Sequence, residues 1–236
     1  METGVDLEEL VGHVVAAMPQ LDAAAVAGPG ARYPPGVGTM TEPQFCAALK
    51  GHLAGHLVQA QERMSVQEPY PGQGRMKCDI CIGPANAVFE WAVEFKKIAF
   101  VGNNGGKNDF GPSKIVSPYP IHGSSVRDAN RLMRNRSGRH AGVLMYIFEL
   151  DDAVVQAGRA LCQQQGIALD QVEKMAATLH DNGGNYYAEP SFEMFQAVST
   201  PFGFRLGRRF QAPFGPLTRH PLFLKGQVAA WEILNP

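Results

Sequence analysis

The sequence predicts a mixed α/β (α+β) domain, with a central mixed sheet flanked by helices. Three observations indicate this class. Apolar residues recur at helical spacing over residues 41–64, alternate with polar ones over residues 88–97, and form a short continuous run over residues 141–149. A helix, strands, a second helix over residues 124–135 and a further strand, in that order, are typical of helices packed on a sheet.

The composition is that of an ordinary globular protein. The 236 residues are 45% hydrophobic and 18% charged, which is enough apolar material for a substantial core. The formal net charge is −1, so a nucleic-acid-binding protein of this kind must gather its positive charge locally. The N-terminus is acidic rather than signal-like, and no apolar run approaches the ~18 residues that span a membrane. Four cysteines in a chain of this length suit reduced thiols, so we expect a cytoplasmic protein without a membrane partner.

The chain divides into three parts. Residues 1–40 hold a short amphipathic helix over 5–18 and then an irregular lead-in over 23–38, which is rich in Ala, Gly and Pro. Residues 41–150 form the core. Residues 151–236 are expected to add helices and strands to that core, and either to specify the substrate or to build a homodimer.

The core begins with a helix over residues 41–64. Thr41 is a good N-cap, and Gln44 follows three residues later, as a capping box requires. Apolar residues then recur at helical spacing: Phe45, Leu49, Leu53, Leu57 and Ala60. We expect the helix to end near Met64, before Pro69.

Two strands follow, over residues 76–82 and 88–97. The second alternates, with one face formed by Phe89, Trp91, Val93 and Phe95. Its other face is formed by Glu90, Ala92, Glu94 and Lys96. Residues 83–86 read Gly-Pro-Ala-Asn, which is turn chemistry, so the two strands are expected to form a hairpin.

Beyond the hairpin the pattern is coarser. Residues 102–122 form a long segment rich in Gly, Asn, Lys and Pro, and loops of this length are usually functional or mobile. A helix over 124–135 is followed by a buried strand over 141–149. In the C-terminal part we expect helices over 152–165 and 168–179, and strands over 192–199, 204–210 and 227–234.

Asp79, Glu94 and Lys96 form the candidate catalytic centre. Glu94 and Lys96 are two residues apart on one strand, so their side chains point to the same side, and Asp79 lies on the preceding strand. Two carboxylates, waters and a substrate phosphate suffice for a hard cation such as Mg²⁺ or Mn²⁺. A nearby ammonium can orient an attacking water or help to deprotonate it. These residue types suit metal-assisted hydrolysis of a phosphodiester.

The hairpin register decides whether the two acids can meet. If the turn is only residues 83–86, Asp79 faces Glu90, and Glu94 lies roughly 13 Å further along at about 3.3 Å per residue. If the loop extends to about residue 90, Asp79 faces Glu94 directly. Both registers place Asp79, Glu94 and Lys96 on one face, but only the second allows a shared metal ion.

The sequence resembles the PD-(D/E)xK, or restriction-endonuclease-like, nuclease superfamily. The matching residues are Asp79 in KCDICI and Glu94-Phe95-Lys96 in WAVEFKK. Cys78 stands where the family name has Pro, and that position varies in the family. The family core is a helix, a strand meander carrying the acid and the ExK, another helix and a further strand, which maps onto roughly residues 41–150.

The resemblance implies a metal-dependent nuclease with a restriction-endonuclease-like core. Asp79 and Glu94 would bind Mg²⁺ (or Mn²⁺), and Lys96 would position or activate a water. In many members the first helix also contributes a Glu, and Glu62, near the end of the 41–64 helix, is the matching position. DNA is the default substrate that the resemblance implies, and RNA stays open.

Basic residues near the centre are candidates for nucleic-acid binding. Three arginines share one helix face, where they can hold a phosphate backbone: Arg127, Arg131 and Arg134. Three lysines flank the glycine-rich residues 102–106, whose backbone can approach phosphates closely: Lys97, Lys107 and Lys114. The plainer interpretations are a solvated helix face and a merely flexible loop.

Two other functions stay open. A catalytically inactive nucleic-acid-binding module of the same fold would bind DNA without metal-dependent cleavage. A structural or interaction protein would carry Glu90, Glu94 and Lys96 as ordinary charges on a solvated strand face, where such pairs stabilise little. The separation of the Asp79 and Glu94 carboxylates discriminates between these functions, because both must reach one ion at about 2.1 Å.

Overall fold

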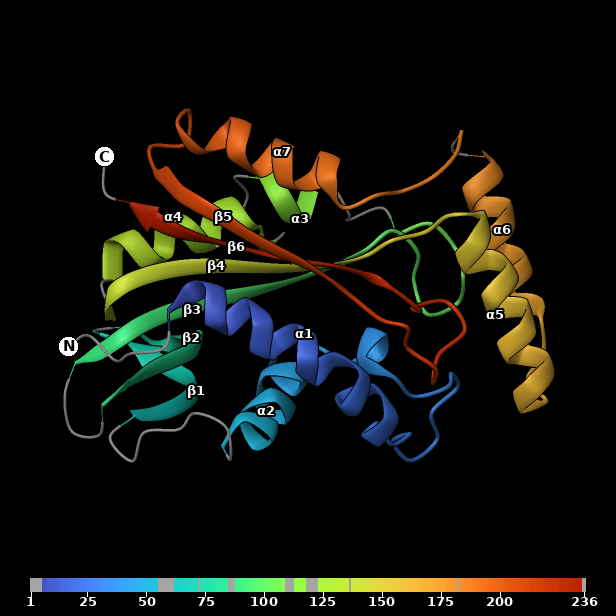
Figure 1. Ribbon diagram of the computed structural model, residues 1–236. Helices are drawn as coiled ribbons and strands as arrows, with labels where there is room; N and C mark the ends of the chain where they lie inside the picture. Colours follow the sequence, from blue (N-terminus) through green and yellow to red (C-terminus); the bar gives the residue numbers. More distant parts are fainter. Residues whose placement is uncertain are drawn as a thin grey trace.

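The computed structural model describes residues 6–54, 62–71, 73–84, 88–108, 113–117, 123–135, 137–181 and 183–234. In this part of the chain, six strands form one mixed sheet in the order β1-β2-β3-β4-β6-β5 (Figure 1). The strands are β1 (Glu62–Tyr70), β2 (Gln73–Pro84), β3 (Phe89–Ala99), β4 (Gly138–Phe148), β5 (Arg205–Phe214) and β6 (Gly226–Leu234). The helices are α1 (Leu7–Ala24), the short 3-10 helix η1 (Val37–Thr39), α2 (Glu42–Leu53), α3 (Ser113–Val116), α4 (Ser125–Asn135), α5 (Asp152–Gln165), α6 (Asp170–Asp181) and α7 (Glu189–Ser199).

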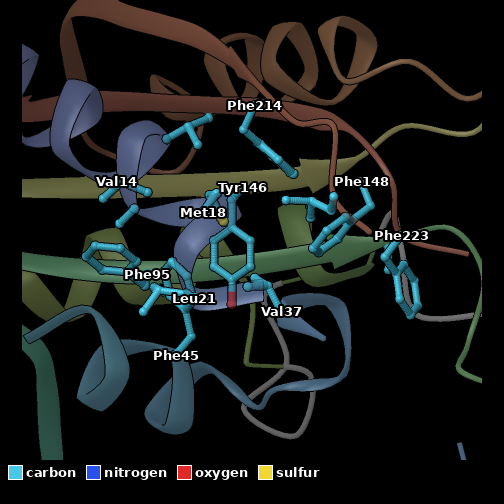
Figure 2. Close-up of a cluster of buried hydrophobic side chains, with 14 of the residues drawn as sticks. Val14, Met18, Leu21, Val37, Phe45, Phe95, Tyr146, Phe148, Phe214 and Phe223 are labelled. Atoms are coloured by element: carbon cyan, nitrogen blue, oxygen red, sulfur yellow. The ribbon is translucent and has the colours of Figure 1, made fainter. Parts of the chain in front are cut away.

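Helices cover both faces of the sheet. Figure 1 shows α1 and α2 on one face and α3, α4 and α7 on the other, with α5 and α6 packed together at one end. The apolar cluster under α1 and α2, on what we call the α1/α2 face, includes Val14, Met18, Phe45, Phe95 and Tyr146 (Figure 2). The cluster under α4 and α7, on what we call the α4 face, includes Val126, Ala129, Leu132, Phe192 and Trp231.

The strand pairing joins both halves of the chain in one sheet. Strands β1, β2 and β3 form an antiparallel meander, and β4 then runs parallel to β3 after a crossover that contains α3 and α4. The C-terminal strands continue the same sheet, since β6 pairs with β4 and β5 pairs with β6, both antiparallel. The fold is therefore a mixed sheet with helices on both faces, as the sequence predicts.

A buried carboxylate ties the N-terminal helix to the rest of the molecule. Asp22, near the end of α1, is 1% exposed. Its Oδ1 accepts a hydrogen bond from the Val37 backbone N–H, and its Oδ2 accepts from the N–H groups of Thr218 and Arg219. One side chain thus holds together η1, α1 and the loop before β6.

Two predicted elements are wrong. The helix expected over residues 41–64 is α2, which ends at Leu53, and a strand, β1, begins at Glu62. From Glu62 onward, the chain is a strand because β1 pairs with β2 along the sheet. Leu57 and Ala60 lie outside the described residues. The strand expected over 192–199 is the helix α7, because its buried residues follow a helical period: Phe192, Phe195 and Ser199.

The glycine-rich segment after β3 is packed against α6. Gly105 has a φ of 77°, and a Cβ there would lie 2.0 Å from the backbone oxygen of Gln171. Thr178 Oγ1 donates to Gly105 O at 3.2 Å. A glycine is therefore needed for close approach to the helix rather than to a phosphate at this position.

No helix in the described part of the chain combines the length and the apolar character needed to cross a membrane.

Candidate functional site

Strands β2 and β3 separate at the candidate centre. Their pairing joins Ile80 to Val93, Cys81 to Ala92 and Ile82 to Trp91. Among the described residues, the pair Ile80–Val93 is the last one on the side of Asp79. This register places Asp79 opposite Glu94. It is the second of the two registers considered above, the one that allows a shared metal ion.

The side chains of β1 also switch from one face of the sheet to the other at this level. Before Gln67, Val66 packs on the α1/α2 face, whereas Tyr70 after it belongs to the α4 face. Gln67 has a φ of 55°, which breaks the regular alternation of the strand. Its amide Nε2 donates to Asp79 Oδ1 at 2.7 Å, so the irregular residue also holds the acid in place. The exchange of faces brings the Tyr70 hydroxyl to the α4 face, where Glu94 lies.

Two carboxylates fill the gap between the diverging strands. Past Val93, the edge of β3 has backbone N–H groups that β2 no longer pairs with. The N–H of Phe95 donates to Asp79 Oδ2 at 2.9 Å, and the N–H of Lys97 donates to Glu42 Oε1 at 2.9 Å. The divergence therefore positions an acid from β2 and an acid from α2 on the same edge of β3.

Local sequence places Glu42 at the start of α2. The predicted capping box is confirmed, because Thr41 accepts from the Gln44 N–H and Gln44 accepts from the Thr41 N–H. Lys97 Nζ donates to the backbone oxygens of Gly38 and Met40, at 3.0 and 2.5 Å, and so attaches this end of the helix to β3. Burial, and secondly the charge of Lys114, lower the pKa of Lys97 to about 8.

Glu94 is buried and held by three donor atoms. Its side chain is 2% exposed, and Oε1 accepts from the Tyr70 hydroxyl and from Arg131 Nε and Nη2, the last two at 3.1 and 2.8 Å. Arg131 Nη2 also donates to Asp128 Oδ1 at 2.6 Å. Burial raises the pKa of Glu94 well above its usual value, nearby Asp128 and Asp79 raise it further, and Arg131 opposes them.

Lys96 lies between two further carboxylates. Its Nζ is 2.9 Å from Asp128 Oδ2 and 3.2 Å from Glu42 Oε2. Burial alone would lower the pKa of Lys96, but Asp128 and Glu42 outweigh it and raise the pKa above the usual value. The ammonium is therefore charged and fixed in position between Asp128 and Glu42.

The donor chemistry of Asp79 and Glu94 fits a hard divalent ion. Both offer oxygen ligands only, and Mg²⁺ is usually held by one or two carboxylates plus waters and substrate phosphates. Within the described ranges, no group of three or more His, Cys, Asp and Glu side chains is arranged to hold a metal ion. An ion bound here would depend on water and substrate for most of its ligands.

The structure corrects the position predicted for Glu62. This residue begins β1 and is not on the first core helix, and its side chain lies outside the described residues. The helix carboxylate that reaches Lys96 is Glu42, twenty residues earlier in the chain. The error follows from extending the helix through residues 54–64.

The candidate nucleic-acid-binding residues fall into two groups. Arg131 and Lys97 turn inward and bind protein groups, as described above. Exposed or half-buried positions are taken by Lys107, Lys114, Arg127 and Arg134. Contact of these four with a nucleic acid stays a prediction.

The charged face of β3 is not solvated. Glu94 is 1% exposed and Lys96 is 6% exposed, and both are in ionic contact with residues of α4. The expectation of ordinary surface charges on this strand is therefore wrong for these two residues, although Glu90 does form an outer pair with Arg139.

Sequence reasoning missed four residues of the site. Asp128 carried a signal, because it falls in the helical phase of buried residues of α4 that include Ser125, Ala129 and Leu132. Glu42 looked like an ordinary acid in the first turn of a helix. Gln67 and Tyr70 come directly after the helix expected over residues 41–64, so no sequence pattern assigned them to a strand of the site.

No protein-family model matches the chain, and searches of curated proteins and of solved structures found no match either. The chemistry of the site is therefore the basis for inferring a function.

Proposed function

We propose that the protein is a metal-dependent nuclease that hydrolyses phosphodiester bonds, with DNA as the default substrate. The observation that carries this proposal is the position of Asp79 opposite Glu94 at the point where β2 and β3 separate. Lys96 follows two residues later on the same side of β3, with its ammonium next to Asp128. Two acids and one ammonium on neighbouring strands are the groups that metal-assisted phosphodiester hydrolysis requires.

Each residue has a role in this proposal. Asp79 and Glu94 would hold Mg²⁺ or Mn²⁺, which supplies charge for the phosphate oxygens and lowers the pKa of a bound water. Lys96 would orient the attacking water and offset charge on the phosphate. Glu42 fixes the Lys96 ammonium from the opposite side to Asp128.

The order of elements also supports the proposal. Helix α2, the meander β1-β2-β3, helix α4 and strand β4 follow one another along the chain. This is the order expected of a restriction-endonuclease-like core, with the acid on β2 and the ExK residues on β3.

Access to the centre requires a movement in α4 or its side chains. Asp79 is 9% exposed and Glu94 is 1% exposed, and Arg131 covers Glu94 with its guanidinium. In the proposed active state Arg131 releases Glu94 and contacts the phosphate instead, which suits a planar cation with several donors.

Incubation of the protein with plasmid DNA, single-stranded DNA and RNA tests the proposal, with Mg²⁺, Mn²⁺ or EDTA in parallel. Wild type should cut in the presence of metal, and EDTA, Lys96→Ala and Asp79→Asn should each abolish cutting. Lys50→Ala, an exposed lysine on α2, is the matched control and should cut like wild type. Cutting that survives Lys96→Ala or EDTA would reject this site.

An inactive nucleic-acid-binding module is the alternative that one observation favours. The Arg131 guanidinium already pairs with Glu94 and Asp128, as a cation must in a site that never binds metal. Such a module would bind DNA in EDTA, would not cut it with either metal, and would keep its affinity in Asp79→Asn.

A further inference from the structure

A cavity of about 370 Å³ lies on the α4 face, at the end of β3 beyond the candidate centre. Its walls come from the segment after β3, from α3 and from the segment that enters α7. The lining includes Phe100, Ile115, Tyr186, Tyr187, Pro190 and Met194. Ile115 belongs to the apolar cluster of the α4 face and Phe100 packs against it, so the cavity and Lys96 are on the same side of the sheet. The volume is in the range of sites for small organic groups.

The cavity has the walls of a site for a flat apolar ring. The rings of Phe100 and Tyr186 stack at 4.7 Å with an angle of 23°. Tyr187 is 46% exposed and Met194 is 38% exposed, although both have large apolar side chains. Among the described residues, only three other large apolar residues are exposed, and none of them lines this cavity.

Positive charge accompanies these aromatic walls. Lys107 lines the cavity, and Lys114 precedes Ile115, another lining residue, in α3. Lys114 is close enough to Lys97 to lower its pKa. Aromatic side chains next to lysines are the usual means of binding single-stranded nucleic acid, because bases stack on the rings and phosphates pair with the cations.

The distance from the candidate centre suits a neighbouring part of one strand of nucleic acid. Phe100 follows Lys96 by four residues, which is roughly 13 Å along an extended backbone at about 3.3 Å per residue. A phosphodiester held at Lys96 would thus have nucleotides of the same strand within reach of the cavity.

We propose that this cavity binds an unpaired nucleobase of the substrate, with stacking on Tyr187 and with Lys107 and Lys114 at the flanking phosphates. The inference rests on the proposed nuclease function and makes its substrate more specific. A base in a duplex must first be unpaired and unstacked before it can enter, which costs free energy that an unpaired base does not pay. The preferred substrate is therefore single-stranded or has unpaired nucleotides beside the bond that is cut.

Fluorescence anisotropy in EDTA tests the cavity without cleavage. The probes are a labelled single-stranded DNA oligonucleotide, the same oligonucleotide with abasic sites, and the corresponding duplex. Because the base would lose its stacking partner, Tyr187→Ala should weaken single-strand binding roughly tenfold and leave duplex binding unchanged. Wild type should bind the abasic strand as weakly as Tyr187→Ala binds the intact one.

Two further variants separate stacking from a general structural effect. Tyr187→Phe keeps the ring and loses only the hydroxyl that accepts from Asn185 Nδ2, so it should bind like wild type. Leu169→Ala removes a large apolar side chain of similar exposure, 37%, outside the cavity and should also bind like wild type. Equal single-strand affinity of wild type and Tyr187→Ala would overturn the proposal.

The failure of this inference and the failure of the proposed function give different results. If metal-dependent cutting is absent but base-dependent binding is lost in Tyr187→Ala, the cavity is supported and the nuclease is not. If cutting depends on Lys96 but duplex and single strand are bound and cut equally by wild type and Tyr187→Ala, the nuclease stands and the cavity proposal falls.

Discussion

Arg131 donates to Glu94 Oε1 from both Nε and Nη2, at 3.1 and 2.8 Å. The same Nη2 atom contacts Asp128 Oδ1 at 2.6 Å, so one cation lies between two carboxylates that are 1% and 2% exposed. Two buried acids this close are costly unless a cation compensates them. If the site binds a metal ion as proposed, the stability of the fold and the binding of that ion would be linked through this one side chain.

Replacing Arg131 with Gln should make stability depend on metal. Removing one partner of a buried ion pair costs about 3–5 kcal/mol, because an uncompensated charge is left behind. Mg²⁺ or Mn²⁺ should restore part of this loss by supplying the missing positive charge. Urea unfolding with metal and with EDTA measures both effects. Arg134→Gln, on the exposed side of α4, is the control, and an Arg131→Gln variant indifferent to metal would contradict the prediction.

Replacing Glu42 with Gln should reduce cleavage and leave the fold intact. The Gln side-chain oxygen can still accept from the Lys97 N–H, but the charge that fixes Lys96 Nζ is lost. Misplacement of a catalytic group by about 1 Å costs roughly a hundredfold in rate, and a loss of about this size is expected. Initial rates on the preferred DNA, beside those of the exposed control Glu193→Gln, give the answer. Unchanged rates would remove Glu42 from the site.

Replacing Asp22 with Ala should destabilise the protein by about 3–5 kcal/mol, because three backbone N–H groups lose a charged acceptor. Asp22→Asn keeps one oxygen acceptor and should cost less. Thermal and urea unfolding of both variants measure the difference, with the exposed Asp181→Ala as the control. If all three variants unfold alike, the side chain does not hold these segments together.

His220 should make the protein sensitive to acid. Burial, and secondly the charge of Lys97, lower the pKa of this imidazole from 6.5 to about 4. Between these two values the unfolded chain binds a proton that the folded chain does not, so stability falls as the pH falls through this window. The contribution of neutral His220 to the free energy of unfolding is fully present above pH 6.5. About 2–3 kcal/mol of that free energy should be lost by pH 4.5.

The variant His220→Phe isolates this contribution from other titrating groups. Phe keeps a ring against Phe223 but removes the Nδ1 atom that accepts from the Leu222 N–H, so the variant should be less stable at pH 7.5. Because Phe has no proton to bind, the stability gap between variant and wild type should narrow or reverse at pH 4.5. Urea unfolding at both pH values measures the gap, and a constant gap would show that His220 does not titrate as expected.

The sequence predicted those elements whose own residues carry the pattern. Alternation located β3 to within a few residues, the strand expected over 76–82 lies within β2, and the apolar run located β4. Helix α5 has the predicted bounds, and its end is marked by Gly166 in the left-handed conformation at the C-cap. These local signals depend on no distant partner.

The parts that were not predicted depend on distant partners. Arg131 has the same helical spacing as Arg127 and Arg134, and only the presence of Glu94 and Asp128 turns it inward. Phe192 and Phe195 suit a strand by composition, but they pack against Trp231 as one side of a helix. The exchange of faces at Gln67 depends on a single backbone angle that no residue pattern encodes.

The continuous sheet also limits how the chain can be shortened. Residues Gly142 to Phe148 of β4 pair with β6. The two strands that complete this side of the sheet, β5 and β6, both lie after residue 204. A fragment ending at residue 150 would keep Asp79, Glu94 and Lys96 but leave residues 142–148 of this hydrophobic strand as an open edge. Such an edge is a template for pairing with other molecules, so the isolated fragment should aggregate rather than act as a minimal enzyme.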